Sequence, residues 1–259
     1  MAALAYERHG SGERVALLHG ANQSARSWRR VSEELATTCE VLAVDLPFHG
    51  RSAEVAVRDV PELGALLGET VGRATYVGYF VGGRGAIELA LASPDALERL
   101  VVIGSVAGVG DPATRQRRLE EQRAIIERLE AAEPAATAYF RESIEARLRR
   151  PDFFLDAEGE AIERAANLEN TPRGLAQFHR HLGLGPADRH GRLAELEMPV
   201  LVVAGALAPP FVALGEELVE LIGRNATLAV LDDAGHPAPF ERPNEFAGIL
   251  RDWMAAETP

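Results

Sequence analysis

The chain has 259 residues, 47% of them hydrophobic and 25% charged, as expected for one large folded domain with a substantial core. Its 39 acidic and 27 basic residues give a net charge of −12, which repels phosphate backbones and anionic membranes. We therefore expect neither nucleic acid nor a membrane as a partner. All the basic residues are arginine, which excludes a lysine Schiff base, and the single cysteine, Cys39, excludes an internal disulfide.

Targeting and metal-binding patterns are absent from the sequence. The N-terminal residues have no basic segment followed by a long apolar run, and no stretch reaches 18 uninterrupted apolar residues, so we expect a soluble, cytoplasmic protein. His179 and His181 are two residues apart, which places them off a common helical face and disfavours a shared metal ion. We expect no cofactor and no metal.

Short β-branched apolar runs alternate with longer amphipathic segments, which predicts a mostly parallel, twisted sheet with helices on both faces. Some of these runs are continuously apolar, as expected when both faces of a sheet are covered. In chain order, the predicted strands are near residues 3–8, 14–18, 40–44, 74–79, 100–104, 200–205 and 227–231, and the predicted helices near residues 27–35, 60–67, 83–92, 212–222 and 244–254.

The alternation breaks in the middle of the chain. Residues 112–198 are rich in Arg and Glu and have helical periodicity, as at Leu119 and Ile126, with no convincing strand. We interpret this stretch as a helical cap inserted into an α/β core formed by residues 1–111 and 199–259. A separate helical domain is the alternative interpretation.

Three groups of motifs follow predicted strands, which is where open α/β sheets place their chemistry. They are LLHGA with VDLPFHGRS, then VGYFVGGR at a strand–helix turn, then AGHP with FERP. Together with LVVAGALAPPF, these segments resemble the ordered motifs of the α/β-hydrolase superfamily over nearly the whole chain. Within it, the chain is most similar to the menaquinone-pathway succinyl-hydroxycyclohexadiene-carboxylate synthases and their hydrolase relatives.

The resemblance implies a G-x-S-x-G turn that presents a serine to a histidine base, with an acid between them along the chain. Phe80 stands at the serine position, Ala208 stands at the acid position, and only His236 remains. A phenyl ring cannot attack a carbonyl group, and a methyl group cannot hold the tautomer of an imidazole. The sequence therefore excludes a conventional serine hydrolase.

The resemblance also implies changes in the pocket beside these positions. Phe48 replaces a glycine that is usual in the family, and Ala21 replaces a bulkier residue. The backbone N–H groups of Ala21 and Val81 fall at the oxyanion-hole positions, where donors survive a change of side chain.

Four side chains are predicted to contact a substrate or ligand. Phe80 and Phe48 offer aromatic surface, although Phe80 is equally consistent with a plug that fills an inactive site. Arg84 falls at the arginine that binds substrate carboxylate in the synthases, and a helix-surface salt bridge is its alternative. Tyr79 is either a substrate contact or pocket wall.

We predict a non-covalent small-molecule enzyme of lyase, isomerase or cyclase type, in which His236 acts as general base. The resemblance favours this interpretation, because the synthases begin an elimination by proton abstraction. The substrate is expected to be small and aromatic or carboxylated. Two alternatives stay open: an inactive or ligand-binding pseudoenzyme, and an engineered or inactivated variant of a synthase or hydrolase scaffold.

Overall fold

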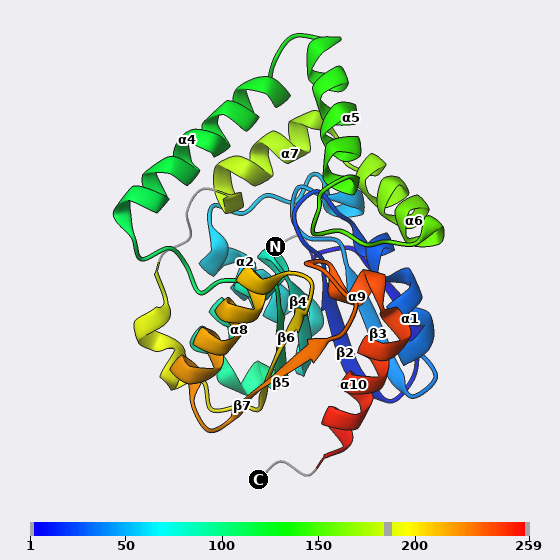
Figure 1. Cartoon of the computed structure of the whole chain (residues 1–259), viewed down its shortest axis with the longest axis vertical. Coiled ribbons are helices and arrows are strands. Elements are labelled where there is room, and N and C mark those ends of the chain that lie inside the picture. The colour runs from blue at the N-terminus through cyan, green and yellow to red at the C-terminus, as the bar shows by residue number, and fades with distance from the viewer. Residues whose placement is uncertain (1–2, 184–187, 257–259) are drawn as a thin grey trace.

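A computed structural model describes residues 3–183 and 188–256. At its centre is a seven-stranded sheet in the order β1-β3-β2-β4-β5-β6-β7 (Figure 1). β1 is antiparallel to β3, and the other neighbouring strands run parallel. The predicted α/β architecture with a mostly parallel sheet is confirmed. The strands are β1 (Tyr6–Gly10), β2 (Glu13–Leu18), β3 (Cys39–Val44), β4 (Ala74–Tyr79), β5 (Leu97–Ile103), β6 (Val200–Gly205) and β7 (Ala226–Leu231).

Helices cover both faces of the sheet because consecutive strand residues point to opposite sides. In β2, Ala16 and Leu18 join an apolar cluster with α2, α3 and α8, whereas Val15 and Leu17 join a second cluster with α1, α9 and α10. These helices are α1 (Arg29–Leu35), α2 (Val60–Val71), α3 (Val81–Ala92), α8 (Pro209–Ile222), α9 (Ala238–Glu241) and α10 (Pro243–Ala255). Short 3-10 turns span Ala25–Trp28, Gly50–Ser52, Pro94–Ala96 and His190–Glu195.

The first strand begins later than the sequence pattern predicts, at Tyr6 instead of residue 3. The Ala5 carbonyl still accepts from the Asp45 N–H at 2.9 Å, but the N–H groups of the preceding residues donate to side chains instead of to β3. The N–H of Leu4 bonds to Thr70 Oγ1, and that of Ala5 bonds to Ser52 Oγ. The apolar side chain of Leu4 still packs in the core, which explains the apolar pattern there.

Four further helices lie along the chain between β5 and β6 and gather above the sheet in Figure 1: α4 (Pro112–Leu129), α5 (Ala135–Leu148), α6 (Ala157–Leu168) and α7 (Pro172–Phe178). Three of them begin where a side chain accepts a hydrogen bond from the first turn, at Asp111, Asp156 and Thr171. The division of the chain into core and cap stays a prediction. No helix in the described part of the chain is both long and apolar enough to span a membrane.

Candidate active site

Phe80 lies at the sharp turn between β4 and α3, with backbone angles φ 51° and ψ −109°. Such a positive φ costs a non-glycine residue on the order of 1–3 kcal/mol. Glycines allow the tight approach: a Cβ on Gly78 would lie 2.4 Å from the Gly83 nitrogen, and one on Gly82 would lie 2.5 Å from the Leu18 oxygen. The strained turn that mounts a nucleophile in the resembling enzymes is thus formed here around a phenyl ring.

The Phe80 ring lines two neighbouring cavities of about 270 and 360 Å³, so this ring does not fill the site. We call the smaller one the His236 cavity and the larger one the Arg84 cavity. Ala21, Phe80, Gln122 and His179 line both. The His236 cavity is completed by Asn22, Tyr79, Arg147, Arg150, Phe153 and His236, and the Arg84 cavity contains, among others, Arg84, Ser105, Arg118, Glu121, Phe178 and Phe211.

His236 lies in the loop between β7 and α9, and its ring is held between aromatic side chains. It stacks on Phe211 with ring centroids 3.8 Å apart, and Phe80 approaches it edge-on at 6.1 Å. Its backbone N–H donates to the Asp152 carbonyl oxygen at 2.9 Å. Its Nδ1 atom is buried and has no hydrogen-bond partner among the described residues. In a catalytic triad this atom donates to the acid.

Burial lowers the pKa of His236 to about 3, and the positive charges of Arg150 and Arg147 act in the same direction. The imidazole is therefore neutral near pH 7 and able to accept a proton. Its basicity is weak compared with that of a base whose pKa is near 7. A bound anion would oppose both arginines and raise this pKa.

Ala208 caps α8 without a side-chain hydrogen bond and is buried. Its loop runs beside the histidine loop, since the N–H of Leu207 donates to the Ala234 oxygen at 2.8 Å. An acid at this position would find both a helix N-terminus and a nearby imidazole. With alanine there, no described carboxylate bonds to His236 Nδ1.

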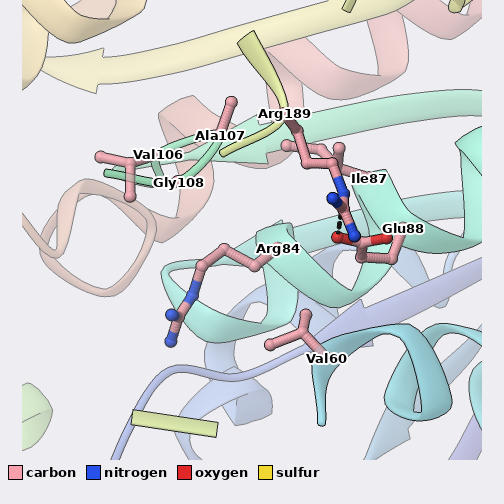
Figure 2. A pocket seen from close by; sticks show the side chains of 8 residues that line it. All are labelled: Val60, Arg84, Ile87, Glu88, Val106, Ala107, Gly108 and Arg189. Carbon is pink, nitrogen blue, oxygen red and sulfur yellow. Dashed lines mark hydrogen bonds and ion pairs between the residues drawn. The ribbon is translucent and has the colours of Figure 1, made fainter. Parts of the chain in front are cut away.

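Arg84 lies in the first turns of α3 and is 8% exposed, with its guanidinium 5.6 Å from the Phe80 ring centroid. Figure 2 shows why it has no acidic partner one helical turn away: Glu88 is bound by Arg189 at 2.7 Å, and the Arg84 side chain points away from that pair. No described carboxylate forms an ion pair with Arg84. Burial lowers the pKa of Arg84 to about 10, with a contribution from Arg118, so it stays charged at pH 7. A buried cation on a cavity wall does not fit the surface salt-bridge interpretation.

Two arginines that the sequence analysis did not single out line the His236 cavity. Arg147, at the end of α5, donates to the Ala21 carbonyl oxygen. Arg150 makes a bidentate ion pair with Asp152, at 2.9 and 2.6 Å. Both guanidinium groups lie over the Phe153 ring, at 5.7 and 5.3 Å. No local sequence signal separates them from the other arginines between residues 112 and 198.

His179 and Gln122 also reach both cavities. The His179 Nδ1 atom lies 2.5 Å from Gln122 Oε1, and burial lowers the pKa of His179 to about 4. From the sequence, His179 is disfavoured as a metal ligand and interpreted as a surface or cap-lining residue, without a role in the reaction. Within residues 3–183 and 188–256, no three His, Cys, Asp or Glu side chains come together in a way that could hold a metal ion.

The remaining predicted residues differ in where they lie. Tyr79 lines the His236 cavity, with its ring 5.1 Å from that of His236, and burial raises the pKa of its phenol. Ala21 lines both cavities, whereas Val81 is fully buried in α3 and lines neither.

Phe48, which was predicted to contact a ligand, lines neither cavity. Its backbone has a φ of 69°, and its buried ring stacks on His181. That positive φ explains why glycine is usual at this position in the resembling sequences.

Residues 15–249 match the alpha/beta hydrolase family over most of the chain. The chain belongs to this family. The 2-succinyl-6-hydroxy-2,4-cyclohexadiene-1-carboxylate synthase of Enterobacter sp. strain 638 is 30% identical over 244 residues, which cover 91% of this chain and 89% of that protein. The pimeloyl-(acyl-carrier protein) methyl ester esterase of Aliivibrio fischeri is 26% identical over 272 residues, covering 97% of each chain.

Among solved structures, MenH from S. aureus superposes with a TM-score of 0.84 over 98% of each chain, at 21% sequence identity. That likeness shows a shared fold. The predicted resemblance to the α/β-hydrolase superfamily and to the synthases is confirmed. The replacement of the nucleophile and acid by Phe80 and Ala208 stays an interpretation of the aligned motifs.

Proposed function

We propose that this chain is a non-covalent enzyme for a small organic anion, in which a neutral imidazole replaces the serine as the reacting group. One observation supports the proposal. His236 lines an open, cation-rich cavity, and Phe80, which stands at the position that the resemblance assigns to the nucleophile, lines the same cavity. The relatives include both a synthase of a cyclic carboxylate and an esterase, so small-molecule chemistry is common to them.

The charges around the site favour an anionic substrate. Arg84 is buried without a described acidic partner, and Arg147 and Arg150 project into the adjoining cavity. Guanidinium groups bind carboxylates through paired donors, and the low dielectric of a buried site strengthens such contacts. The aromatic rings of Phe80 and Tyr79 supply apolar surface beside these cations, which suits an unsaturated or aromatic carboxylate.

In this proposal His236 is the general base of a lyase, isomerase or cyclase reaction. Its imidazole is unprotonated at pH 7, so it can accept a proton directly from carbon or oxygen. The negative charge of the substrate compensates Arg150 and Arg147 and raises the pKa of the imidazole while the substrate is bound. General bases of this kind contribute roughly 10²–10⁴-fold in rate.

The test uses 5-nitrobenzisoxazole, a small aromatic probe that reports a base in a cavity. A base removes its ring C–H proton, the N–O bond breaks, and the coloured 2-cyano-4-nitrophenolate forms. We expect the wild-type chain to accelerate this ring opening above buffer and His236→Ala to slow it by about tenfold or more. His9→Ala, which removes a half-exposed histidine of β1, is the matched control. Equal rates for all three proteins would rule out the proposed base.

A ligand-binding pseudoenzyme is the second candidate, and the unpartnered Nδ1 of His236 with its lowered pKa favours it. A weakly basic imidazole without an acid behind it is a poor catalyst. The ring-opening rate and a second measurement, the melting temperature with benzoate, separate the two candidates. If benzoate raises the melting temperatures of wild type and His236→Ala equally, and neither protein opens the ring faster than buffer, the chain is the pseudoenzyme.

A further inference from the structure

His179 is a second imidazole on the wall of the same cavity, and the proposed reaction does not use it. It follows α7 and begins the π-helical turn His179–Gly183, so it reaches the cavity from the inserted helices, whereas His236 reaches it from a loop of the sheet. It is 7% exposed and lines both the His236 cavity and the Arg84 cavity. The two imidazoles thus face one cavity from different parts of the chain.

The Gln122 side chain faces the Nδ1 atom of His179. Its Oε1 atom lies 2.5 Å from His179 Nδ1, and an amide oxygen can only accept a hydrogen bond. With the amide oxygen facing the ring, Nδ1 carries the proton, and in the neutral ring Nε2 keeps its lone pair. No described residue bonds to that Nε2, and it is not among the fully enclosed atoms that lack a partner. It is available as a proton acceptor.

The Nδ1 atom of His179 therefore has a hydrogen-bond partner, whereas the Nδ1 atom of His236 has none among the described residues. The Nδ1 of His236 is buried without a partner, so nothing among the described residues fixes its tautomer. Gln122 gives His179 a fixed tautomer and would stabilise the imidazolium that forms when Nε2 takes a proton, because it accepts from the Nδ1–H in both states. The charged side chains that line the two cavities with His179 are Arg84, Arg118, Glu121, Arg147 and Arg150.

We propose that His179 is a second proton acceptor of this site, held in its reactive tautomer by Gln122, and that its Nε2 atom takes a proton from the bound molecule. This inference rests on the proposed function and adds a residue to it. The proton moves from the substrate to Nε2, the bonding electrons stay on the substrate, and Gln122 acts only by positioning and polarising the ring.

The first test is the ring opening of 5-nitrobenzisoxazole by three variants. We expect His179→Gln to lower the rate by about tenfold, which is less than the full effect of a general base because His236 remains. Gln122→Leu removes the acceptor for Nδ1–H and should lower the rate severalfold. Gln122→Glu keeps that acceptor and adds a negative charge that raises the pKa of His179, so it should restore at least the wild-type rate and move the acidic limb of the pH–rate profile to higher pH. A purely structural glutamine would give no such gain.

The second test needs no turnover and therefore holds even if a variant fails to fold. Long-range ¹H–¹⁵N NMR of the wild-type imidazoles should show the Nδ1–H tautomer for His179 at pH 7. An Nε2–H tautomer overturns the proposal, whatever the rates. Melting temperatures of the variants show whether a lost rate reflects lost structure.

The outcomes separate this inference from the proposed function. A full rate in His179→Gln together with a lost rate in His236→Ala overturns the role of His179 and leaves the proposed function standing. A lost rate in His179→Gln with a full rate in His236→Ala supports His179 and removes His236 as the base. Wild-type protein that does not exceed buffer overturns both.

Discussion

At the scale of single residues, the buried Nδ1 atom of His236 has no hydrogen-bond partner in the described part of the chain. His236 Nδ1 lies where Gly104 leaves room, since a Cβ on Gly104 would be 2.8 Å from it. An unsatisfied buried polar atom costs on the order of 1–3 kcal/mol. The ring is held instead by its stack on Phe211. Packing against Phe211, and no described hydrogen bond at Nδ1, orients this imidazole.

We expect Ala208→Asp to raise the pKa of His236 from about 3, because a carboxylate near Nδ1 stabilises the imidazolium. NMR titration of the imidazole measures this pKa directly. Ala208→Asn is the matched control, since it caps α8 comparably but carries no charge. If the aspartate leaves the pKa unchanged, the acid position does not reach the histidine. Combined with Phe80→Ser, the aspartate should give measurable hydrolysis of 4-nitrophenyl acetate, because the strained turn at residue 80 is already formed.

At the scale of elements, the short helix α9 fixes the histidine loop to the segment after α5. The buried Glu241 carboxylate accepts from the N–H of Phe154 at 2.6 Å and from the N–H of Gly235 at 2.5 Å. The His236 N–H donates to the Asp152 oxygen in the same region. Three backbone segments thus meet at one carboxylate, next to the imidazole.

Replacing Glu241 with alanine leaves two backbone N–H groups without their acceptor. At about 1–3 kcal/mol for each unsatisfied buried group, we expect the free energy of unfolding to fall by roughly 2–6 kcal/mol, as measured by urea denaturation. Glu216→Ala, an exposed change in the middle of α8, should stay within about 0.5 kcal/mol of wild type. Comparable losses from the two variants would show that Glu241 is no more than an ordinary surface acid.

At the scale of the whole molecule, four histidines are buried in neutral form. Burial lowers the pKa of His19 and of His179 to about 4, that of His236 to about 3, and that of His49 well below its usual value. The first two loop motifs use theirs as structural acceptors: His19 Nε2 accepts from the Leu46 N–H at 3.0 Å. A protonated imidazole has no free lone pair, so it can no longer accept these hydrogen bonds.

Acid should therefore unfold this protein early. Between pH 6.5 and about 4 the unfolded chain binds protons that the folded histidines do not, so stability is complete above pH 6.5 and falls as the pH decreases. Each such group contributes about 1.4 kcal/mol per pH unit once its unfolded form is protonated. Urea unfolding at pH 7, 6 and 5 should show a steepening loss of several kcal/mol. A loss no larger than one group predicts would mean that these histidines are not neutral in the folded state.

Much of the fold could be predicted because its signals are local. Continuous apolar runs marked β5 and β6, and glycines spaced around Phe80 marked the turn, since a strand covered on both faces and a tight turn each restrict nearby residue types. Boundaries shifted where side chains replaced the sheet ladder, as before Tyr6. The assignment of Phe80, Ala208 and His236 to the positions of a hydrolase site also came from motif spacing, and it stays a prediction.

The character of the pocket depended on tertiary structure. Arg84 lacks Glu88 as an acidic partner because Arg189 binds that carboxylate, and Arg189 lies 101 positions beyond Glu88 in the chain. The contact between Gln122 and Nδ1 of His179 requires α4 and the turn after α7 to pack together, although the two residues are 57 positions apart. Sequence by itself determined the family and the sheet, because those depend on short-range patterns. Charge, tautomer and cavity shape depend on side chains far apart in the chain, and only their packing brings them together.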